Sequence, residues 1–286
     1  MLKAPKWYRR LLLLRDFAIA CYREPETARM ALPFWKAMRD GSRFAQNWPR
    51  AANSDCTLSA DTVPANPLMD WFTNHNQGHQ VWKWQHYFEV YHLHLAHFVG
   101  QLVTVVEIGV LGGGSLEMWA TCFGPRCNVY GIDIDPQCKQ YEAERIAVVI
   151  GDQQDQQFWA TFKSRVPVVD VVIDDGGHRY EQQKVTLEEM LPHLQPGGVY
   201  ICEDVHFSHN LFAQYSVDLV AQLNRMESVS RSDTGARVSR SAYQQAVHSF
   251  HFYPYLLVIE KHREIVSDMA SQKRGRYNPE QENVMV

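Results

Sequence analysis

From residue 103 onward, short runs of β-branched residues alternate with longer stretches that have helical periodicity. Most of these runs consist of successive apolar residues instead of alternating apolar and polar ones, which is typical of parallel strands that are covered on both faces. Strands and helices that alternate along a chain predict a doubly wound α/β sheet. The expected strands are Val103–Ile108, Asn128–Ile132, Ile146–Ile150, Val168–Ile173 and Gly198–Cys202, and the expected helices are Ser115–Phe123, Pro136–Arg145, Gln156–Val166 and Tyr180–Leu194.

Two more strands are expected near the carboxyl end, after a helical stretch from Leu211 to Met226. Ser249–Phe252 and Leu256–Lys261 are separated by only three residues, which is too few for the crossover that parallel strands need. We therefore expect an antiparallel edge. The seven strands together predict a Rossmann-like, doubly wound sheet whose last strand is antiparallel.

The first 70 residues have a different character, and we expect a helical N-terminal extension followed by a linker or lid. Apolar residues recur at helical spacing between Leu11 and Ala18, and residues 1–50 hold 11 Lys/Arg against 4 Asp/Glu. This basic helix could pack on the main domain or on another subunit, or it could make a peripheral membrane contact with anionic lipid. Residues 47–70 read as irregular, so the main domain is expected at residues 71–286.

A long helix is expected from about Gln80 to Phe98, because apolar residues step by three and four along it. Aromatic residues are concentrated near its start. Trp82, Trp84 and Tyr87 could form a wall on which a carbohydrate stacks, or they could form a buried aromatic face.

The amino-acid composition and the net charge exclude some classes of protein. The chain is 45% hydrophobic and 21% charged, which is typical of a globular protein, and its net charge of −4 argues against a nucleic-acid partner. The six cysteines form no CxxC pair and read as reduced thiols. No apolar run approaches the roughly 20 residues of a membrane span. We therefore expect a cytoplasmic location.

Glycine and polar residues follow three successive strands. The first strand runs into Glu107-Ile-Gly-Val-Leu-Gly-Gly-Gly-Ser115, a turn that lets the backbone approach a ligand before a helix begins. The second ends at Asp133, at the spacing of a carboxylate that binds ribose hydroxyls, and the third ends in Gly151-Asp152-Gln153. Because Glu107 would repel a pyrophosphate, the pattern favours S-adenosylmethionine over NAD.

Four carboxylates and a histidine follow the fourth and fifth strands: Asp174, Asp175, His178, Glu203 and Asp204. The carboxyl ends of neighbouring parallel strands lie side by side, so we expect these acids to be close together. Their mutual repulsion then requires either raised pKa values or a bound cation. An all-oxygen set suits magnesium or calcium. His178 could act as a general base near neutral pH, or it could cap the following helix.

These segments resemble the class I S-adenosylmethionine-dependent methyltransferases. More closely, they resemble the magnesium-dependent sugar O-methyltransferases of macrolide biosynthesis (the mycinamicin and macrocin type) and the related cephalosporin-hydroxylase group. The resemblance covers roughly residues 70–262 and includes the segments Pro196–Asp204 and His251–Lys261. Its most specific part is Asp174-Asp-Gly-Gly-His178 combined with Glu203-Asp204.

The resemblance implies a set of site residues. His178 would be the catalytic base that deprotonates a sugar hydroxyl, and Asp175, Glu203 and Asp204 would bind Mg²⁺. The cofactor-binding residues would be Glu107, Gly109, Gly113, Ser115, Asp133, Asp152, Gln153 and Asp174, with the last near the methionine end of S-adenosylmethionine.

The function that follows is O-methylation of a sugar hydroxyl on a small-molecule glycoside or a glycan, by an enzyme that the family suggests is a homo-oligomer. A catechol-type O-methyltransferase and a non-catalytic scaffold that binds S-adenosylmethionine are alternatives. A partner role in an oxidation pathway is a third, although no facial triad of two histidines and one carboxylate is evident from sequence spacing.

Overall fold

The computed structural model describes residues 36, 39–47, 65–206, 210–226, 228–232 and 235–275. The chain divides into two units, Met1–Pro64 and Ala65–Val286. Residues 39–46 of the first unit are helical, whereas the expected helix at Leu11–Ala18 lies outside the described residues. Within the described ranges no helix is both long and apolar enough to cross a membrane. The expected membrane contact, homo-oligomer and cytoplasmic location stay predictions.

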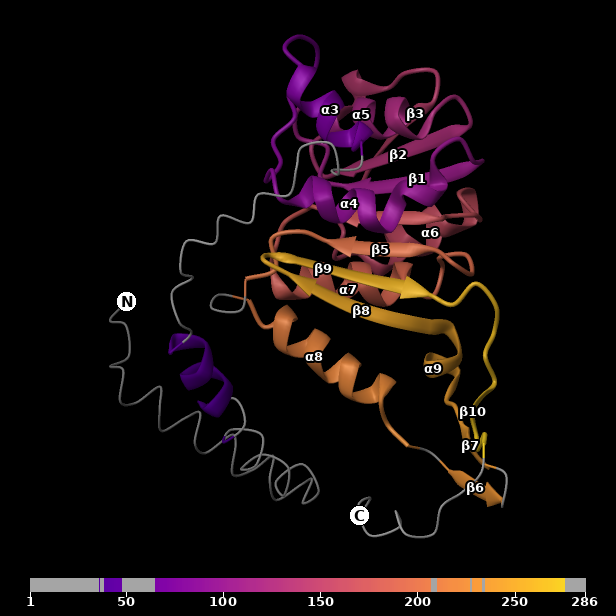
Figure 1. Cartoon of the computed structure of the whole chain (residues 1–286). Helices are drawn as coiled ribbons and strands as arrows, with labels where there is room; N and C mark the ends of the chain where they lie inside the picture. Colours follow the sequence, from indigo (N-terminus) through magenta and orange to yellow (C-terminus); the bar gives the residue numbers. More distant parts are fainter. Residues whose placement is uncertain are drawn as a thin grey trace. The chain divides into compact units, whose positions relative to one another are not determined.

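A seven-stranded sheet forms the centre of the second unit (Figure 1). Its order is β3 (Ile146–Ile150), β2 (Cys127–Asp133), β1 (Val103–Ile108), β4 (Val171–Asp174), β5 (Val199–Cys202), β9 (Leu256–Lys261) and β8 (Val247–Tyr253). The first five of these strands are mutually parallel, and β9 is antiparallel to both β5 and β8. The predicted doubly wound sheet with an antiparallel last strand is therefore confirmed.

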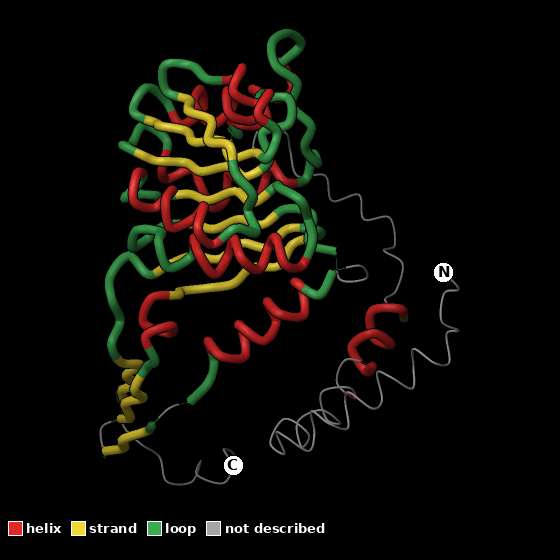
Figure 2. The backbone as a smooth tube through the Cα atoms, turned by 180° about the vertical axis from the view of Figure 1, so that it is seen from behind, coloured by secondary structure: helices red, strands yellow, loops and turns green. Residues whose placement is uncertain are grey.

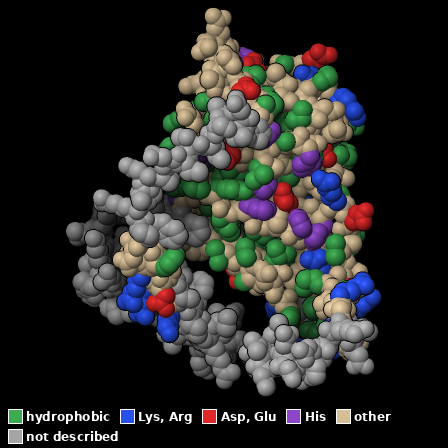
Figure 3. Space-filling view, viewed as in Figure 1, with side chains coloured by type: hydrophobic (Ala, Val, Ile, Leu, Met, Phe, Trp, Pro, Cys, Tyr) green, Lys and Arg blue, Asp and Glu red, His purple; other side chains and the backbone are tan. Residues whose placement is uncertain are grey.

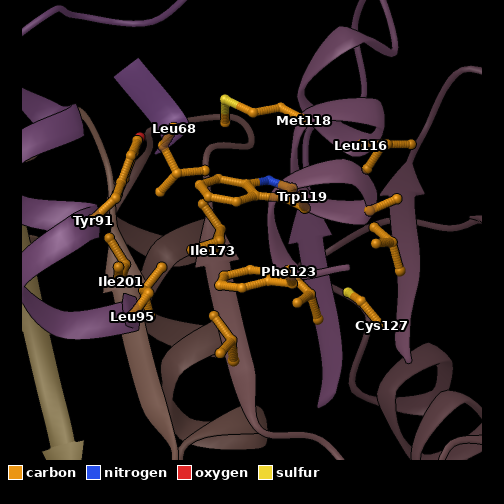
Figure 4. Close-up of a cluster of buried hydrophobic side chains, with 14 of the residues drawn as sticks. Leu68, Tyr91, Leu95, Leu116, Met118, Trp119, Phe123, Cys127, Ile173 and Ile201 are labelled. Atoms are coloured by element: carbon orange, nitrogen blue, oxygen red, sulfur yellow. The ribbon is translucent and has the colours of Figure 1, made fainter. Parts of the chain in front are cut away.

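Helices cover both faces of this sheet, because alternate strand residues point to opposite sides. On one face lie α3 (Pro67–Asn74), α4 (Tyr87–Leu95) and α5 (Gly114–Phe123), whose apolar side chains pack on strand residues such as Ile173 and Ile201 (Figure 4). On the other face lie α6 (Gln156–Arg165), α7 (Tyr180–Met190) and α8 (Phe212–Leu223), seen from behind in Figure 2. Truncating one of the large buried aromatic residues, such as Trp119 or Trp159, would cost about 3–5 kcal/mol.

Helix α3 begins inside the segment expected to be irregular. The Asn66 side chain accepts a hydrogen bond from the backbone N–H of Met69, and Pro67 occupies the first turn, where its missing N–H costs nothing. The expectation of a linker up to residue 70 is therefore wrong from Pro67 onward, because Asn66 and Pro67, which also suit a linker, here cap and begin a helix.

The helix expected from Gln80 is shorter in the structure. Residues 80–84 are not helical, α4 begins at Tyr87, and a 3₁₀ helix, η2 (Ala96–Phe98), follows it. The apolar residues before Tyr87 mimic a helical period, yet the chain there forms no regular element, and Lys83 is buried between the exposed Trp82 and Trp84. The expected helix at Pro136–Arg145 is likewise only a 3₁₀ helix, η3 (Pro136–Tyr141).

A small antiparallel sheet was not expected. It consists of β6 (Val229–Ser232), β7 (Gly235–Ser239) and β10 (Asp268–Gln272), and the short helix α9 (Ala242–Ala246) follows β7. The residues of β6 and β10 are exposed and mostly polar. They lack the β-branched run that marks the central strands, so the sequence pattern gave no signal.

Candidate functional site

A cavity of about 560 Å³ opens at the carboxyl ends of the parallel strands, where ligands of doubly wound sheets bind. Residues from the turns after all five parallel strands line it. Of the predicted site residues, those in the cavity wall are Gly109, Asp133, Asp152, Gln153, Asp175, His178, Glu203 and Asp204. Glu107, Gly113, Ser115 and Asp174 do not line it.

The glycine turn after β1 is held tightly against its neighbours. Gly109 has a φ of 91°, and a side chain there would collide with the carbonyl oxygen of Asp175. Oδ2 of Asp133 accepts hydrogen bonds from the backbone N–H groups of Val110 at 2.9 Å and Leu111 at 3.3 Å. The turns after β1, β2 and β4 are thereby fixed relative to one another.

Glu107, at the end of β1, is fully buried behind the cavity wall. It accepts a hydrogen bond from Ser115 Oγ at 2.7 Å, and this contact fastens the start of α5 to the sheet. Burial raises the pKa of Glu107, although Lys83 and the Ser115 hydroxyl oppose that shift. Glu107 and Ser115 thus support the turn from behind.

Lys83 enters the same region and was not predicted as a site residue. Its Nζ lies 2.6 Å from Oδ2 of Asp175, 2.8 Å from Oε1 of Glu203 and 3.1 Å from Oε1 of Glu107. Burial alone lowers the pKa of Lys83, but the three carboxylates more than compensate and hold it well above its usual value. Lys83 is therefore a permanent cation inside the acidic cluster.

Asp174 and Gln153 form a buried support for the turn that carries His178. Asp174 accepts hydrogen bonds from Tyr200 Oη at 3.0 Å and from Gln153 Nε2 at 3.1 Å, and burial raises its pKa to about 6. Oε1 of the Gln153 side chain accepts a hydrogen bond from the backbone N–H of Gly177 at 2.8 Å. Two side chains predicted to touch the cofactor thus also hold the Asp-Gly-Gly-His turn in position.

Asp204 is oriented by two aromatic donors. Its Oδ1 accepts hydrogen bonds from Trp84 Nε1 at 3.1 Å and Tyr87 Oη at 3.0 Å. Its Oδ2 lies 3.6 Å from Nε2 of His178, and Oδ1 of Asp175 lies 3.8 Å from the same nitrogen. His178 and Asp204 have φ angles of 52° and 54°, a strained conformation for residues with side chains.

The predicted metal ligands Asp175, Glu203 and Asp204 are divided between two overlapping groups, and neither group contains both Glu203 and Asp204. Asp175, His178 and Asp204 have ligand atoms within 4.8 Å of one another, and so do Glu107, Asp175 and Glu203. Lys83 occupies the second group. The group of Asp175, His178 and Asp204 still has more carboxylates than cationic side chains around it. The oxygen donors of Asp175 and Asp204 suit a hard divalent ion.

Aromatic residues at the cavity divide into exposed and buried ones. The side chains of Trp82 and Trp84 are 80% and 53% exposed and line the cavity, whereas Tyr87 is fully buried beneath Asp204. Tyr91 is also buried and donates a hydrogen bond to Oε1 of Glu203 at 2.6 Å. The sequence predicts the aromatic cluster and the carboxylates Glu203 and Asp204 separately, but not the hydrogen bonds that join them.

The chain is similar to known proteins over this part of its length. Residues 106–205 match a family model described as a methyltransferase domain. A curated relative from Streptomyces olivaceus, 8-demethyl-8-alpha-L-rhamnosyl tetracenomycin-C 2'-O-methyltransferase, is 34% identical over 64% of this chain and 52% of the relative. Mycinamicin VI 2''-O-methyltransferase from Micromonospora griseorubida is 35% identical over 50% of this chain and 33% of its own length.

A solved structure is also similar. It is the MycE methyltransferase of the mycinamycin biosynthetic pathway in complex with Mg, SAH and mycinamycin VI, with a TM-score of 0.55 and 26% identity over 69% of this chain and 53% of that one. The chain spans about half, or less, of the length of these relatives.

Proposed function

We propose that this chain, whose residues 106–205 match a methyltransferase-domain family model, transfers a methyl group from S-adenosylmethionine to a sugar hydroxyl with the help of a divalent cation. The observation that carries the proposal is the convergence of two features in one cavity. The glycine turn after β1 and the group of Asp175, His178 and Asp204 share its wall. The names of the two curated relatives, both O-methyltransferases of glycosylated natural products, support the substrate class.

The cofactor would lie over the glycine turn and the ends of β2 and β3. Asp133 and Asp152 stand at those ends in the cavity wall and can accept hydrogen bonds from ribose hydroxyls. S-adenosylmethionine carries a sulfonium and an ammonium group, so an acidic wall attracts it. Gly109 lets the turn after β1 pack closely against the Asp175 turn, because a side chain there would collide with the carbonyl oxygen of Asp175.

Asp175 and Asp204 would hold the cation, with Glu203 as the third ligand. A bound divalent cation of this kind lowers the pKa of a coordinated hydroxyl group and orients it. His178 would accept the hydroxyl proton at Nε2, which lies between the two aspartates. Trp84 and Tyr87 would keep Asp204 in position, since both donate to the oxygen that faces away from His178.

Lys83 would keep the acidic cluster assembled before the cation arrives. Its ammonium group binds one oxygen of Asp175 and one of Glu203, and its positive charge offsets the repulsion between these two carboxylates. Nζ of Lys83 is held by three carboxylates and its side chain is only 2% exposed. The His178 side chain is 37% exposed at the cavity, so it is the better placed base.

The acceptor would rest on the exposed indole rings of Trp82 and Trp84. Both lie at the cavity, and the apolar face of a sugar ring stacks on such surfaces. A flat aromatic acceptor could stack there too, so the choice between acceptors needs an experiment.

The test is methyl transfer from labelled S-adenosylmethionine to a panel of rhamnosylated aglycones and catechols, with Mg²⁺ or with EDTA. We expect methylation of glycosides only, its loss with EDTA, and a decrease of about 10²–10⁴-fold in His178→Ala, the range that general base catalysis contributes. His248→Ala, a histidine on β8 outside the cavity wall, is the matched control. Methylation of catechols alone would reject the sugar acceptor, and full activity in EDTA would reject the role of the cation.

A further inference from the structure

A second cluster of potential metal ligands lies outside the methyltransferase cavity. It consists of His94 on α4, His251 on β8 and Glu260 on β9, whose ligand atoms lie within 4.8 Å of one another. Glu260 pairs with Val199 at the start of β5, whereas the cavity residue Glu203 follows the end of that strand. The length of β5, about 10 Å, therefore separates the cluster from the cavity.

This region of the surface is rich in histidine. Figure 3 shows histidine side chains gathered on the face that carries α4, β8 and β9. The rings of His94 and His251 are 4.7 Å apart, and those of His248 and His262 are also 4.7 Å apart. Imidazoles concentrated beside a carboxylate supply the donors that first-row transition metals prefer.

The two imidazoles approach the two oxygens of one carboxylate. His94 Nδ1 lies 2.8 Å from Oε1 of Glu260, and His251 Nε2 lies 3.7 Å from Oε2. A zinc ion at its usual distance of about 2.0–2.2 Å from nitrogen and oxygen ligands separates those ligands by about 3.3–3.6 Å. Both of these contacts lie within about half an ångström of that separation.

His94 has a second hydrogen-bond partner besides Glu260. Its Nε2 lies 2.9 Å from Tyr253 Oη, so a proton on Nε2 can be donated to the phenol oxygen while Nδ1 presents its lone pair to the ion. Ser249 Oγ lies 3.0 Å from both His251 Nε2 and Glu260 Oε2, on the opposite side of the cluster. His94 is 4% exposed, so its position is fixed by packing.

We propose that His94, His251 and Glu260 form a binding site for a divalent transition metal such as Zn²⁺, which joins helix α4 to the β8–β9 edge of the sheet. Residues 94, 251 and 260 are far apart in sequence, which is why no facial triad is evident from spacing. The three protein ligands leave at least one coordination position for water or for Ser249. When the metal binds, Nδ1 of His94 loses the proton that it shares with Glu260. Protons therefore compete with the metal, and the metal affinity decreases as pH falls.

The experiment uses the full chain without an affinity tag, freed of metal with EDTA and then desalted. Zn²⁺ binding is measured by competition with a chromogenic chelator in excess Mg²⁺, which occupies oxygen-ligated sites. Visible absorption of Co²⁺ reports the coordination geometry in the same samples. The variants are His251→Ala and Glu260→Gln, and the controls are His248→Ala on the same strand and Asp204→Asn in the cavity.

We expect one Zn²⁺ site in the wild type, weakened more than about 100-fold in His251→Ala and Glu260→Gln and unchanged in both controls, since the loss even of an outer-shell partner costs 10–100-fold. Co²⁺ should show the absorption of a four- or five-coordinate site. The proposal is overturned if the wild type binds no Zn²⁺, if Co²⁺ shows only six-coordinate absorption, or if Asp204→Asn rather than His251→Ala removes the site. Circular dichroism of each variant excludes misfolding as the cause.

Discussion

The ammonium group of Lys83 lies 2.6 Å from Oδ2 of Asp175, inside the acidic cluster at the carboxyl ends of β4 and β5. The two residues are 92 positions apart in sequence, and the side chain of Lys83 is only 2% exposed. The protein therefore carries its own cation where the sequence predicts a metal ion. Lys83 and an incoming cation would share Asp175, with one carboxylate oxygen for each.

Replacing Lys83 by methionine should destabilise the protein strongly. The variant leaves Glu107, Asp175 and Glu203 without their counterion, and breaking a buried pair costs about 3–5 kcal/mol. We expect urea unfolding in EDTA to show this loss, and millimolar Mg²⁺ to restore more stability to the variant than to the wild type. Lys139→Met removes an exposed ion pair with Glu142 and should change stability by less than about 1 kcal/mol. Equal effects of the two substitutions would contradict the role assigned to Lys83.

Gly109→Ala should prevent cofactor binding. A methyl group at this position meets the Asp175 carbonyl oxygen, so either the glycine turn or the Asp175 turn must move. Gly124 provides a matched control, because its φ of 94° is similar but a side chain there meets nothing within 4 Å. Gly124→Ala should cost about 1–2 kcal/mol through backbone strain alone and leave the affinity for S-adenosylhomocysteine unchanged. Calorimetric titration of both variants decides the point, and wild-type affinity in Gly109→Ala would count against the placement of the cofactor.

Asp174 should make stability depend on pH in the mildly acidic range. Burial raises its pKa to about 6, above the value of about 3.9 for an unfolded chain. The folded state thus holds the proton more tightly, so this contribution is complete below about pH 4 and is lost as pH rises through about 6. Relative to Asp174→Asn, the wild type should lose on the order of 3 kcal/mol between pH 4 and 7. Urea unfolding of both proteins at several pH values in EDTA measures the difference, and parallel pH profiles would refute the assignment.

Tyr87→Phe should weaken cation binding without affecting the cofactor. The phenol donates to Oδ1 of Asp204, and loss of such a supporting hydrogen bond reduces metal affinity about 10–100-fold. Tyr243→Phe removes a hydrogen bond to the Leu219 carbonyl, away from the cavity, and serves as the control. Mg²⁺ titrations of the two variants should differ, while their S-adenosylhomocysteine affinities should not. An unchanged Mg²⁺ affinity in Tyr87→Phe would show that Asp204 does not depend on this contact.

The central sheet could be predicted because its strands are buried on both faces and therefore read as continuous apolar runs. The predicted bounds of β1, β3 and β9 agree with the structure at every residue. The carboxylates after β4 and β5 could be predicted to converge because β4 and β5 are neighbouring parallel strands. Their register pairs Asp174 with Cys202, so the residues that follow leave the sheet at the same edge.

Contacts that depend on the path of a loop could not be predicted. Lys83 belongs to a segment whose aromatic residues imitate a helical period, and nothing in its local sequence marks it as buried. The cluster of His94, His251 and Glu260 depends on the packing of α4 against β8 and β9. Such partners follow from tertiary packing, which residue spacing does not encode.

The proposed function requires a cavity that binds S-adenosylmethionine beside a divalent cation. Calorimetric titration of S-adenosylmethionine and S-adenosylhomocysteine, with Mg²⁺ or EDTA, on the wild type and Asp175→Asn tests it most directly. We predict that both proteins bind the cofactor, and that Mg²⁺ binds the wild type at least about tenfold more tightly than the variant. Folded wild-type protein that binds neither form of the cofactor would contradict the account.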